Sequence, residues 1–547
     1  MPVVTATIAH KTEGVMPVTF EVLSLDIERE VNRVPRCDLR LLDGDLAKAT
    51  FPISDTAFFE PGAELTISLR YEGKSDEVVF AGLVVRHGLS LSRKGSILAI
   101  ELKDKAVALT RPRKSAIFAD SSDADAITTI AKAGGLTIVK IAATVPEKHV
   151  QLVQFDASDW DFILTRAEAQ GLVLAVTDGA LTVAEVMAAG TTTHTLEYGK
   201  DDIFSVDIEA DGLYQPGAVE GVAWDPDNQA ITPTTTAAEQ SNPLGNLDAA
   251  AIVTSLGFQD TVLRHLAPLE PKELAAWADG EVARARMSMV RGRLSIPGIA
   301  TPKLLDSIKL VGMGKRFAGT TTITAIRHRV TKGGWVTDMQ FGFSPELLSK
   351  SREVSSPPAS GLLPGVTGLQ IGVVSSFEKD PLGAYRIKVL IPGIDAVKGI
   401  VWARLASPDA GPERGFFFRP ETGDEVIVGF VNGDPRQAIV LGSLYSKKNA
   451  PPADFAKLAE DNFLKGIVSQ TGVTIGISDE EPMATIKTPG GASIVLDDAE
   501  GGIIITDANG NSITLNADGI TITSAKDLTL DGSGGNVAIL GKKVDVK

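Results

Sequence analysis

Residues 484–546 decide the fold of this chain, and they read ATIKT-PGG-ASIVLDD-AEGG-IIITD-ANGN-SITLN-ADG-ITITS-AKD-LTLD-GSGG-NVAIL-GKKVDV. Short runs of Ile, Val, Leu and Thr alternate with Asp, Lys, Asn and Ser. That period of two turns successive side chains to opposite faces of a β-strand. Turn signals separate the runs, at Asn509-Gly510, Asp518-Gly519 and Asp531-Gly532. The pattern therefore predicts a series of short strands joined by tight turns.

The apolar side of these strands has nothing in the sequence to cover it. No aromatic residue follows Phe463, and so thin a stack of strands has little core of its own. We therefore expect several copies of the chain to wrap together into an intertwined β-needle. A small sandwich, a single-chain β-solenoid and a calcium-binding solenoid stay open as alternatives. The glycine-rich nonapeptide of the last class does not recur around residues 532–535.

The side chains expected inside such a needle are the apolar residues of its runs. They are Ile494, Leu496, Ile503, Ile505, Ile513, Leu515, Ile520, Ile522, Leu528 and Leu530. Because Ile503, Ile504 and Ile505 follow one another, the pattern leaves open which of the three points inward. We single out Ile504 as an inward position to test with a charged residue.

Composition places the chain among soluble proteins with many short strands. It has 547 residues, enough for three or four domains, with 53 Gly and only 5% aromatic residues. Its net charge of −16 gives it no bulk attraction for nucleic acid or an anionic membrane. The single cysteine, Cys37, excludes internal disulfides and thiolate zinc sites, and we expect it to be a small core residue.

The N-terminal residues lack the charged region and apolar run of a standard signal peptide. No apolar stretch approaches the length that spans a membrane. We therefore expect the chain to be made and assembled in the cytoplasm and to leave, if it leaves, by another route.

Further along the chain, strands dominate and helices are few. Residues 3–110 alternate as β-strands do, and Ser122 and Ser158 are plausible caps of helices that end near Gly134 and Gly171. Pro271 begins a third helix, which runs through Met289. Residues 225–246 read as an exposed loop.

The first strong break covers residues 344–365, and a second covers 446–452. About five strands between them fit a small barrel of the oligonucleotide-binding (OB) type, a fold name that does not imply nucleic acid. The run Phe416-Phe417-Phe418 in this block is expected to be core or interface.

No pattern of catalytic or metal-ligating residues stands out. The six histidines lack helical i, i+4 pairing, and His328 reads as a core or interface residue. Residues 312–316 read as a turn between strands rather than a phosphate loop. The adjacent pairs Glu480-Glu481 and Asp497-Asp498 point to opposite faces of a strand and read as solvated. We therefore expect no catalytic residue, no cofactor and no metal.

Residues 364–446 resemble the barrel of VgrG-type spike proteins. The motifs that carry the resemblance are Gly372-Val373-Val374, Asp380-Pro381-Leu382-Gly383, Arg386-Ile387-Lys388-Val389, Ile391-Pro392-Gly393, Trp402-Ala403-Arg404, Pro420-Glu421-Thr422-Gly423-Asp424-Glu425-Val426, Gly433-Asp434-Pro435-Arg436 and Gly442-Ser443-Leu444-Tyr445. Their order and spacing together are specific, whereas each motif alone is weak. The N-terminal region is similar to the same family more loosely, at residues 30–35, 41–45, 159–162 and 319–328.

The resemblance implies a mainly β homotrimer with minor α structure. It implies a hub domain with two β-barrels at residues 1–345 that joins the tail tube, and a linker at 346–365. An OB-fold neck barrel at 366–446 and a linker at 447–461 would follow. A triple-stranded β-helical needle at 462–547 would end the chain.

The resemblance also implies partners and a setting. The partners are tail-tube and baseplate proteins, a PAAR-type tip protein and, in some relatives, effectors. Candidates for contact with the tip protein are Leu540, Gly541, Lys542, Val544 and Val546. The setting is a contractile injection machine, either an extracellular phage-tail-like particle or a type VI secretion system in the cell envelope, and the needle would pierce the target membrane.

The neck barrel runs within a few residues into the needle, so we expect a plain spike that does no chemistry. Two alternatives stay open: a type VI spike that also carries effectors non-covalently, and a trimeric tail fibre or adhesin that binds a receptor.

Overall fold

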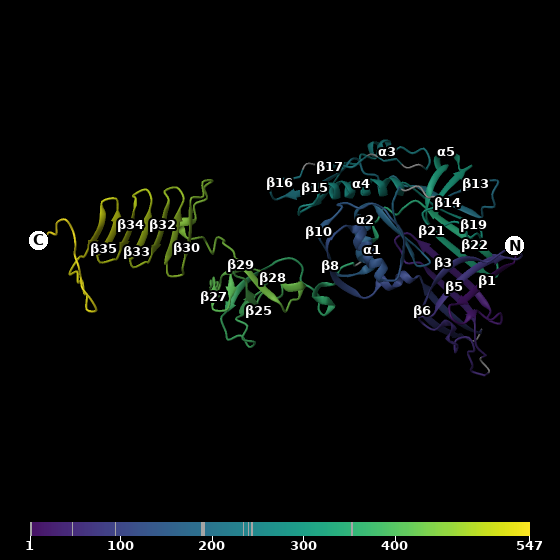
Figure 1. Ribbon diagram of the computed structural model, residues 1–547, viewed down its shortest axis with the longest axis horizontal. Helices are drawn as coiled ribbons and strands as arrows, with labels where there is room; N and C mark the ends of the chain where they lie inside the picture. Colours follow the sequence, from purple (N-terminus) through teal and green to yellow (C-terminus); the bar gives the residue numbers. More distant parts are fainter. Residues whose placement is uncertain are drawn as a thin grey trace. The chain divides into compact units, whose positions relative to one another are not determined.

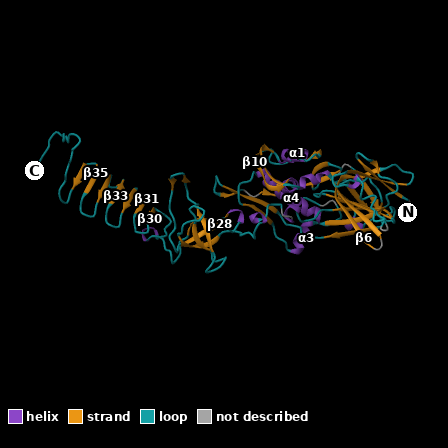
Figure 2. Ribbon diagram, turned by 90° about the horizontal axis from the view of Figure 1, so that it is seen from below, coloured by secondary structure: helices purple, strands orange, loops and turns teal. Residues whose placement is uncertain are grey.

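The computed structural model describes residues 3–45, 48–92, 95–187, 192–232, 235–238, 240–241, 244–351 and 354–546. The chain divides into two compact units, Met1–Ser356 and Pro357–Lys547. Lys547 of the predicted needle and residues 352–353 of the predicted first linker lie outside the described residues. Both units are mainly β, as predicted (Figure 2).

The first unit is built on one large sheet of 13 strands. Its path runs β14-β19-β22-β21-β3-β4-β7-β6-β5-β1-β2, with β20 beside β21 and β13 beside β20. The strands are β1 (Val4–His10), β2 (Gly14–Val15), β3 (Val22–Glu30), β4 (Arg36–Leu42), β5 (Glu64–Tyr71), β6 (Glu77–Ser92), β7 (Gly95–Lys103), β13 (Thr193–Glu197), β14 (Ser205–Ala210), β19 (Val290–Pro297), β20 (Ser307–Val311), β21 (Gly319–Thr331) and β22 (Gly334–Phe341).

Two separate hydrophobic cores lie along this sheet. The first contains Leu25, Cys37 and Phe80 from β3, β4 and β6, and the second contains Leu294 and Phe341 from β19 and β22. The sheet is continuous between the two cores, where β3 pairs with β21, and the two barrels implied by the resemblance stay a prediction. Cys37 is fully buried, as predicted, and burial raises the pKa of its thiol well above the usual range.

A layer of helices and short strands follows β7 in the chain. It comprises β8 (Arg113–Ser121), α1 (Asp123–Ala133), β9 (Thr137–Ile141), β10 (His149–Ser158), α2 (Asp159–Ala169), β11 (Leu172–Thr177) and β12 (Ala180–Glu185). The predicted caps are confirmed, because the Ser122 and Ser158 hydroxyls accept from the backbone N–H groups of Asp125 and Asp161. The side chains of α1 and α2 share a core around Trp160.

A second group of elements lies between β14 and β19 in chain order, although these two strands are neighbours in the sheet. It comprises β15 (Val219–Asp225), β16 (Ala230–Ile231), β17 (Thr235–Thr236), α3 (Ala249–Leu256), β18 (Thr261–His265) and α4 (Pro271–Ser288). Helix α4 begins at the predicted proline and packs on β15 (Figure 1). Helix α3 was not predicted, and β16 and β17 fall within the expected loop of residues 225–246. The turn expected at residues 312–316 joins β20 to β21 and includes the single-turn helix α5 (Gly314–Phe317).

The second unit begins with a closed five-stranded barrel, in the order β23-β24-β25-β29-β28. Its strands are β23 (Gln370–Ser376), β24 (Ile387–Leu390), β25 (Ile400–Leu405), β28 (Glu425–Phe430) and β29 (Ala438–Ser443). A small hairpin, β26 (Ala410–Gly411) and β27 (Arg414–Gly415), lies between β25 and β28 in the chain. Val389, Ala403 and Val428 are buried inside the barrel. The predicted OB-type barrel is confirmed.

A seven-stranded antiparallel sheet follows the barrel (Figures 1 and 2). Its strands are β30 (Leu464–Val468), β31 (Thr474–Ser478), β32 (Met483–Lys487), β33 (Ser493–Asp497), β34 (Gly502–Thr506), β35 (Ser512–Asn516) and β36 (Gly519–Thr523). Each strand pairs with the next, so β31 to β35 are hydrogen-bonded on both sides within one chain. These five strands therefore have no unpaired edge left for another chain. The part of this sheet that a partner could cover is one of its two faces.

Candidate functional site: the apolar face of the C-terminal sheet

Each strand from β30 to β36 sends two side chains to the same face of the sheet. In the antiparallel register Ile494 lies opposite Ile505, and Leu496 lies opposite Ile503. The alignment continues strand by strand, so two rows of side chains cross the sheet. The first row is Ile467, Ile475, Ile486, Ile494, Ile505, Ile513 and Ile522, and the second is Lys465, Ile477, Ala484, Leu496, Ile503, Leu515 and Ile520.

This surface, which we call the apolar face, is uncovered in the single chain. Ile494 is 39% exposed, Ile505 39% and Ile513 37%, and Ile522 near the end of the sheet is 52% exposed. Single apolar residues on a surface are common in soluble proteins, but two contiguous rows of them mark an interaction surface. The apolar face is therefore the candidate functional site of this unit.

The opposite face of the sheet carries smaller and more polar side chains. Its central row is Gly466, Gly476, Thr485, Val495, Ile504, Thr514 and Thr521. Ser493 and Thr506 form a hydrogen bond of 2.7 Å between their hydroxyls across β33 and β34. The register answers the question left open by the isoleucine run, since Ile503 and Ile505 share the apolar face and Ile504 lies on the opposite one. The choice of Ile504 as a position on the same face as the core candidates is therefore wrong.

Polar turns fix this register at the ends of the strands. Between β34 and β35 the Asp507 carboxylate accepts hydrogen bonds from the backbone and side chain of both Asn509 and Asn511. The bonds from Asn511, followed by those from Asn509, lower the pKa of Asp507 to about 2. Gly510 has a φ of +89°, a conformation that glycine adopts without strain. A shift of one residue would move every isoleucine to the other face, so these turns protect the apolar face.

The predicted core candidates divide into two groups. Those from Ile494 to Ile522 lie together on the apolar face. Leu528 and Leu530 are 55% and 61% exposed and lie beyond β36, in a segment without strands over residues 524–546. The sequence interpretation missed Ile467, Ile475, Ile477 and Ile486, although the same alternation at residues 464–487 gave the signal. Whether these side chains line a trimer interior stays a prediction.

The predicted tip residues lie in the same strandless C-terminal segment. Leu540 is 92% exposed, Val544 52% and Val546 93%, and Gly541 and Lys542 are exposed as well. Their contact with a tip protein stays a prediction.

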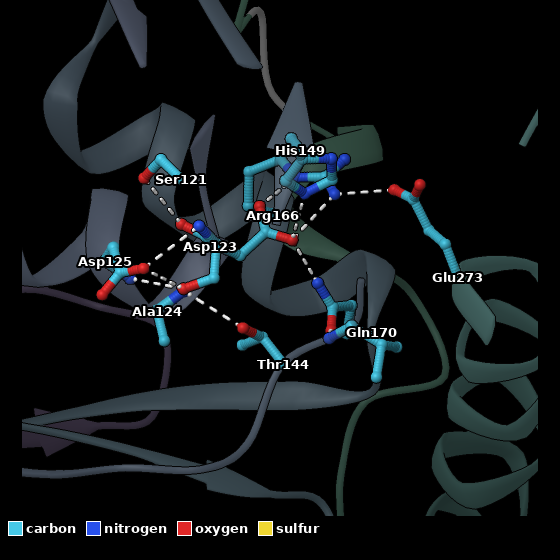
Figure 3. A network of polar contacts seen from close by, with 11 residues as sticks. Ser121, Asp123, Ala124, Asp125, Thr144, His149, Arg166, Gln170 and Glu273 are labelled. Atoms are coloured by element: carbon cyan, nitrogen blue, oxygen red, sulfur yellow. Dashed lines mark hydrogen bonds and ion pairs between the residues drawn. The ribbon is translucent and has the colours of Figure 1, made fainter. Parts of the chain in front are cut away.

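A buried polar network lies in the first unit, and Figure 3 shows it at close range. The Asp123 carboxylate at the start of α1 is 1% exposed. It accepts hydrogen bonds from Arg166 Nε at 2.6 Å and Arg166 Nη2 at 2.9 Å, from Gln170 Nε2, and it lies 3.1 Å from His149 Nε2. Arg166 Nη2 also donates to Glu273 Oε1 of α4 at 2.7 Å. The network thus connects α1, α2, β10 and α4.

The chemistry of this network is structural. Burial alone would lower the pKa of the Arg166 guanidinium, but Asp123 and Glu273 outweigh burial and raise that pKa above its ordinary value. The sequence interpretation did not find the network, because its members are far apart in the chain and only Asp123 stood next to a recognised cap.

Among the described residues, no group of three or more His, Cys, Asp or Glu side chains is placed to hold a metal ion. His328 is 1% exposed in the first unit, which confirms its interpretation as a core residue. Within that same described part of the chain, the helices are too short or too polar to cross a bilayer.

Three family models match the chain. The Alg8 N-terminal domain model matches residues 1–332. The model of the type VI secretion system and phage-baseplate injector OB domain matches residues 370–445, which contain the five-stranded barrel. The phage baseplate V C-terminal trimerisation domain model matches residues 483–547, which contain β32 to β36 of the apolar face.

Curated relatives match shorter segments. The type VI secretion system spike protein VgrG3 of Vibrio cholerae serotype O1 is 44% identical over 55 residues, covering 10% of this chain and 5% of that protein. The spike protein VgrG4b of Pseudomonas aeruginosa is 30% identical over 143 residues, covering 25% of this chain and 18% of that protein. The matches thus cover less than a fifth of either relative.

Solved structures give longer but more distant matches. The 43 kDa tail protein of prophage MuSo2 from Shewanella oneidensis has a TM-score of 0.45 at 13% identity, covering 63% of this chain and 99% of that one. A component of the type VI secretion system of E. coli has a TM-score of 0.39 at 12% identity, covering 80% of this chain and 99% of that one.

Proposed function

Because the chain belongs to the VgrG-type family of spike proteins, we propose that it is a structural spike of a contractile injection apparatus that self-associates through its apolar face. The observation that carries this proposal is the uncovered pair of isoleucine and leucine rows on β30 to β36. Covering one half-exposed Ile or Leu stabilises by about 1 kcal/mol. The two rows together therefore supply a driving force large enough to hold copies together.

The support for three copies is the match of residues 483–547 to a trimerisation domain model. Three copies related by rotation would turn all their apolar faces toward one axis. The resulting column would be narrow, with Thr, Ser and Gly on its outer surface. In this proposal rigidity comes from the sheet's own hydrogen bonds together with a shared interior.

The first unit would then join the spike to tail-tube and baseplate proteins, and the end of the chain would hold a PAAR-type tip protein near Leu540 and Val544. The support for both contacts is the resemblance to the family. In this reading the work of piercing comes from contraction of the machine, the chain carries no catalytic site of its own, and it acts in the cell envelope or in an extracellular particle.

Two neighbouring residues of β35 test the proposal. Ile513 belongs to the apolar face and Thr514 to the opposite face. Ile513→Asp would place a carboxylate in the shared interior, which costs several kcal/mol, so we expect the solution mass to fall from trimer toward monomer. Thr514→Asp, the matched control, should keep the mass of the unmodified protein.

The measurement is multi-angle light scattering on the purified full-length proteins. Equal masses for the two variants would contradict the assignment of the apolar face as the interface. A loss of mass for Thr514→Asp alone would assign the interface to the opposite face.

A further inference from the structure

The run Phe416, Phe417 and Phe418, expected to be core or interface, lies on the surface of the five-stranded barrel, which leaves interface as the remaining alternative. These side chains are 56%, 73% and 66% exposed. The interior of the barrel is already filled by small aliphatic side chains such as Val389 and Val428. The segment between β25 and β28 therefore carries its phenylalanines outward, and we call these three residues the aromatic knob.

The aromatic knob is held in one conformation by its own segment. Arg414 Nη1 donates to both carboxylate oxygens of Asp409, at 2.6 and 2.7 Å. The Phe416 N–H donates to the Asp409 carbonyl at 3.0 Å, and the Ser407 hydroxyl donates to the Phe416 carbonyl at 2.6 Å. A surface that is ordered before binding loses little conformational entropy when a partner covers it.

Arg419 fixes the rings as well. Its guanidinium carbon lies 5.2 Å from the ring centroid of Phe377, which follows β23, and 5.2 Å from that of Phe417. Stacking of this kind ties the segment to the barrel. Phe377 is itself 43% exposed, so the aromatic surface continues from the knob onto the end of β23.

A second apolar surface lies at the other end of β23. Leu369, Ile371 and Leu441 are 58%, 46% and 50% exposed. A Cβ at Gly429 would lie 3.4 Å from Leu441 Cδ1 and 3.6 Å from Leu369 Cδ2, so these two side chains close over a glycine. We call these three residues the aliphatic patch. Leu369 and Phe377 are eight residues apart, roughly 25 Å along an extended strand.

We propose that the aromatic knob of one copy docks on the aliphatic patch of the next copy, so that the barrels form a closed ring. The proposal rests on the proposed self-association, which would bring the barrels close together because they precede the apolar face in the same compact unit. Two different surfaces on one barrel are what a head-to-tail contact needs, and such contacts close into a ring under rotation.

The small area of the contact favours a tethered second copy of the chain, rather than a free protein, as the partner of the aromatic knob. Each buried aromatic side chain contributes about 150–250 Å², so knob and patch together bury several hundred Å². A stable free-standing interface needs about 1,200–2,000 Å². The knob and patch are therefore too small to associate alone, but tethered copies reach effective concentrations of the order of millimolar, at which weak contacts form.

Engineered disulfides in the full-length chain test the ring. The variant carries Phe417→Cys and Leu441→Cys together, and the natural Cys37 is fully buried and does not compete. Under mild oxidation we expect covalent dimers and trimers on a non-reducing gel for most of the protein. Each single substitution, and the matched pair Phe417→Cys with Leu382→Cys, should give only background cross-linking. Leu382 is 75% exposed and follows β23 in the chain, whereas Leu369 of the aliphatic patch precedes that strand.

Light scattering on the same samples separates this inference from the proposed function. Trimers without the cross-linked ladder would overturn the ring and leave self-association standing. Cross-linking by Phe417→Cys alone would show that two knobs meet each other, which also overturns the ring. A monomeric unmodified protein would overturn the proposed function itself.

Discussion

The buried His328 side chain in the first unit is held in its neutral form by its surroundings. The His328 ring on β21 lies 5.8 Å from the Trp335 ring, and its Nδ1 atom lies 3.1 Å from Thr337 Oγ1. Burial, and then the positive charge of Arg29, lower the pKa of His328 to about 3. The folded protein therefore holds this ring neutral over a pH range in which the unfolded chain protonates it.

The stability of the first unit should fall as pH decreases from about 6.5 to about 3. The unfolded chain binds one more proton than the folded one in this window, so His328 contributes a slope of about 1.4 kcal/mol per pH unit. The contribution is fully present above the unfolded pKa and is lost as the pH falls toward the folded value. His328→Gln should remove that slope, as measured by urea denaturation at pH 6.5, 5.5 and 4.5.

His265, which is exposed at the end of β18, gives the matched control. His265→Gln should leave the slope as it is in the unmodified protein. An unchanged slope in His328→Gln would mean that the ring is protonated in the folded state.

In the barrel, Asp380 is another residue whose pKa is shifted by its surroundings, as that of His328 is in the first unit. Its carboxylate accepts hydrogen bonds from the Arg386 side chain and from the backbone N–H groups of Leu382 and Ala384. The Arg386 guanidinium, and then these backbone donors, hold the pKa of Asp380 well below its usual range. This explains in physical terms why the Asp-Pro-Leu-Gly motif and the following arginine occur together in the sequence.

At the scale of elements, helix α4 packs closer to its neighbours than its sequence suggests. Gly280 lies against Gly171, and a Cβ on Gly280 would be 2.6 Å from the Gly171 backbone nitrogen. Gly171 has a φ of +66°, in the left-handed region that glycine tolerates. The close approach lets α4 reach the loop after α2, and the Arg166–Glu273 ion pair connects α4 to α2 itself.

Gly280→Ala should therefore destabilise the protein. In an exposed helix the same change stabilises by about 1 kcal/mol, but here the added methyl group forces two backbones apart, and overpacking of this kind costs about 1–3 kcal/mol. The change in the free energy of unfolding would be measured with urea, with Lys272→Ala on the exposed part of α4 as control. A gain in stability for Gly280→Ala would contradict the close packing.

The sequence predicted elements well where the signal was local. The caps at Ser122 and Ser158 and the proline at residue 271 located three helices, because a cap or a proline acts within one turn. Alternation predicted the strands of the C-terminal sheet but not their partners. The isoleucine run could not be resolved without the register that places Ile494 opposite Ile505. The phenylalanine run stayed open between core and interface, because three aromatic residues in sequence look the same in a core and on a surface.

At the scale of the whole molecule, both units contain hydrophobic cores. The second unit also has an apolar surface on its C-terminal sheet that the described residues leave exposed. The cores of the first unit and of the barrel are filled by side chains of the same chain. In the sheet from β30 to β36, the five inner strands are paired on both edges, but one apolar face is uncovered. Family membership and this face point to the same conclusion, that the chain is completed by copies of itself.

The measurement that tests this conclusion most directly is the solution mass of the full-length chain, beside a version that ends at residue 461. Because the truncated version keeps the barrel and the first unit but lacks the apolar face, we expect a trimer for the full chain and a lower mass for the truncated one. A monodisperse monomer of the full-length chain would contradict the account, because the isoleucine and leucine rows would then be stable in water without a partner.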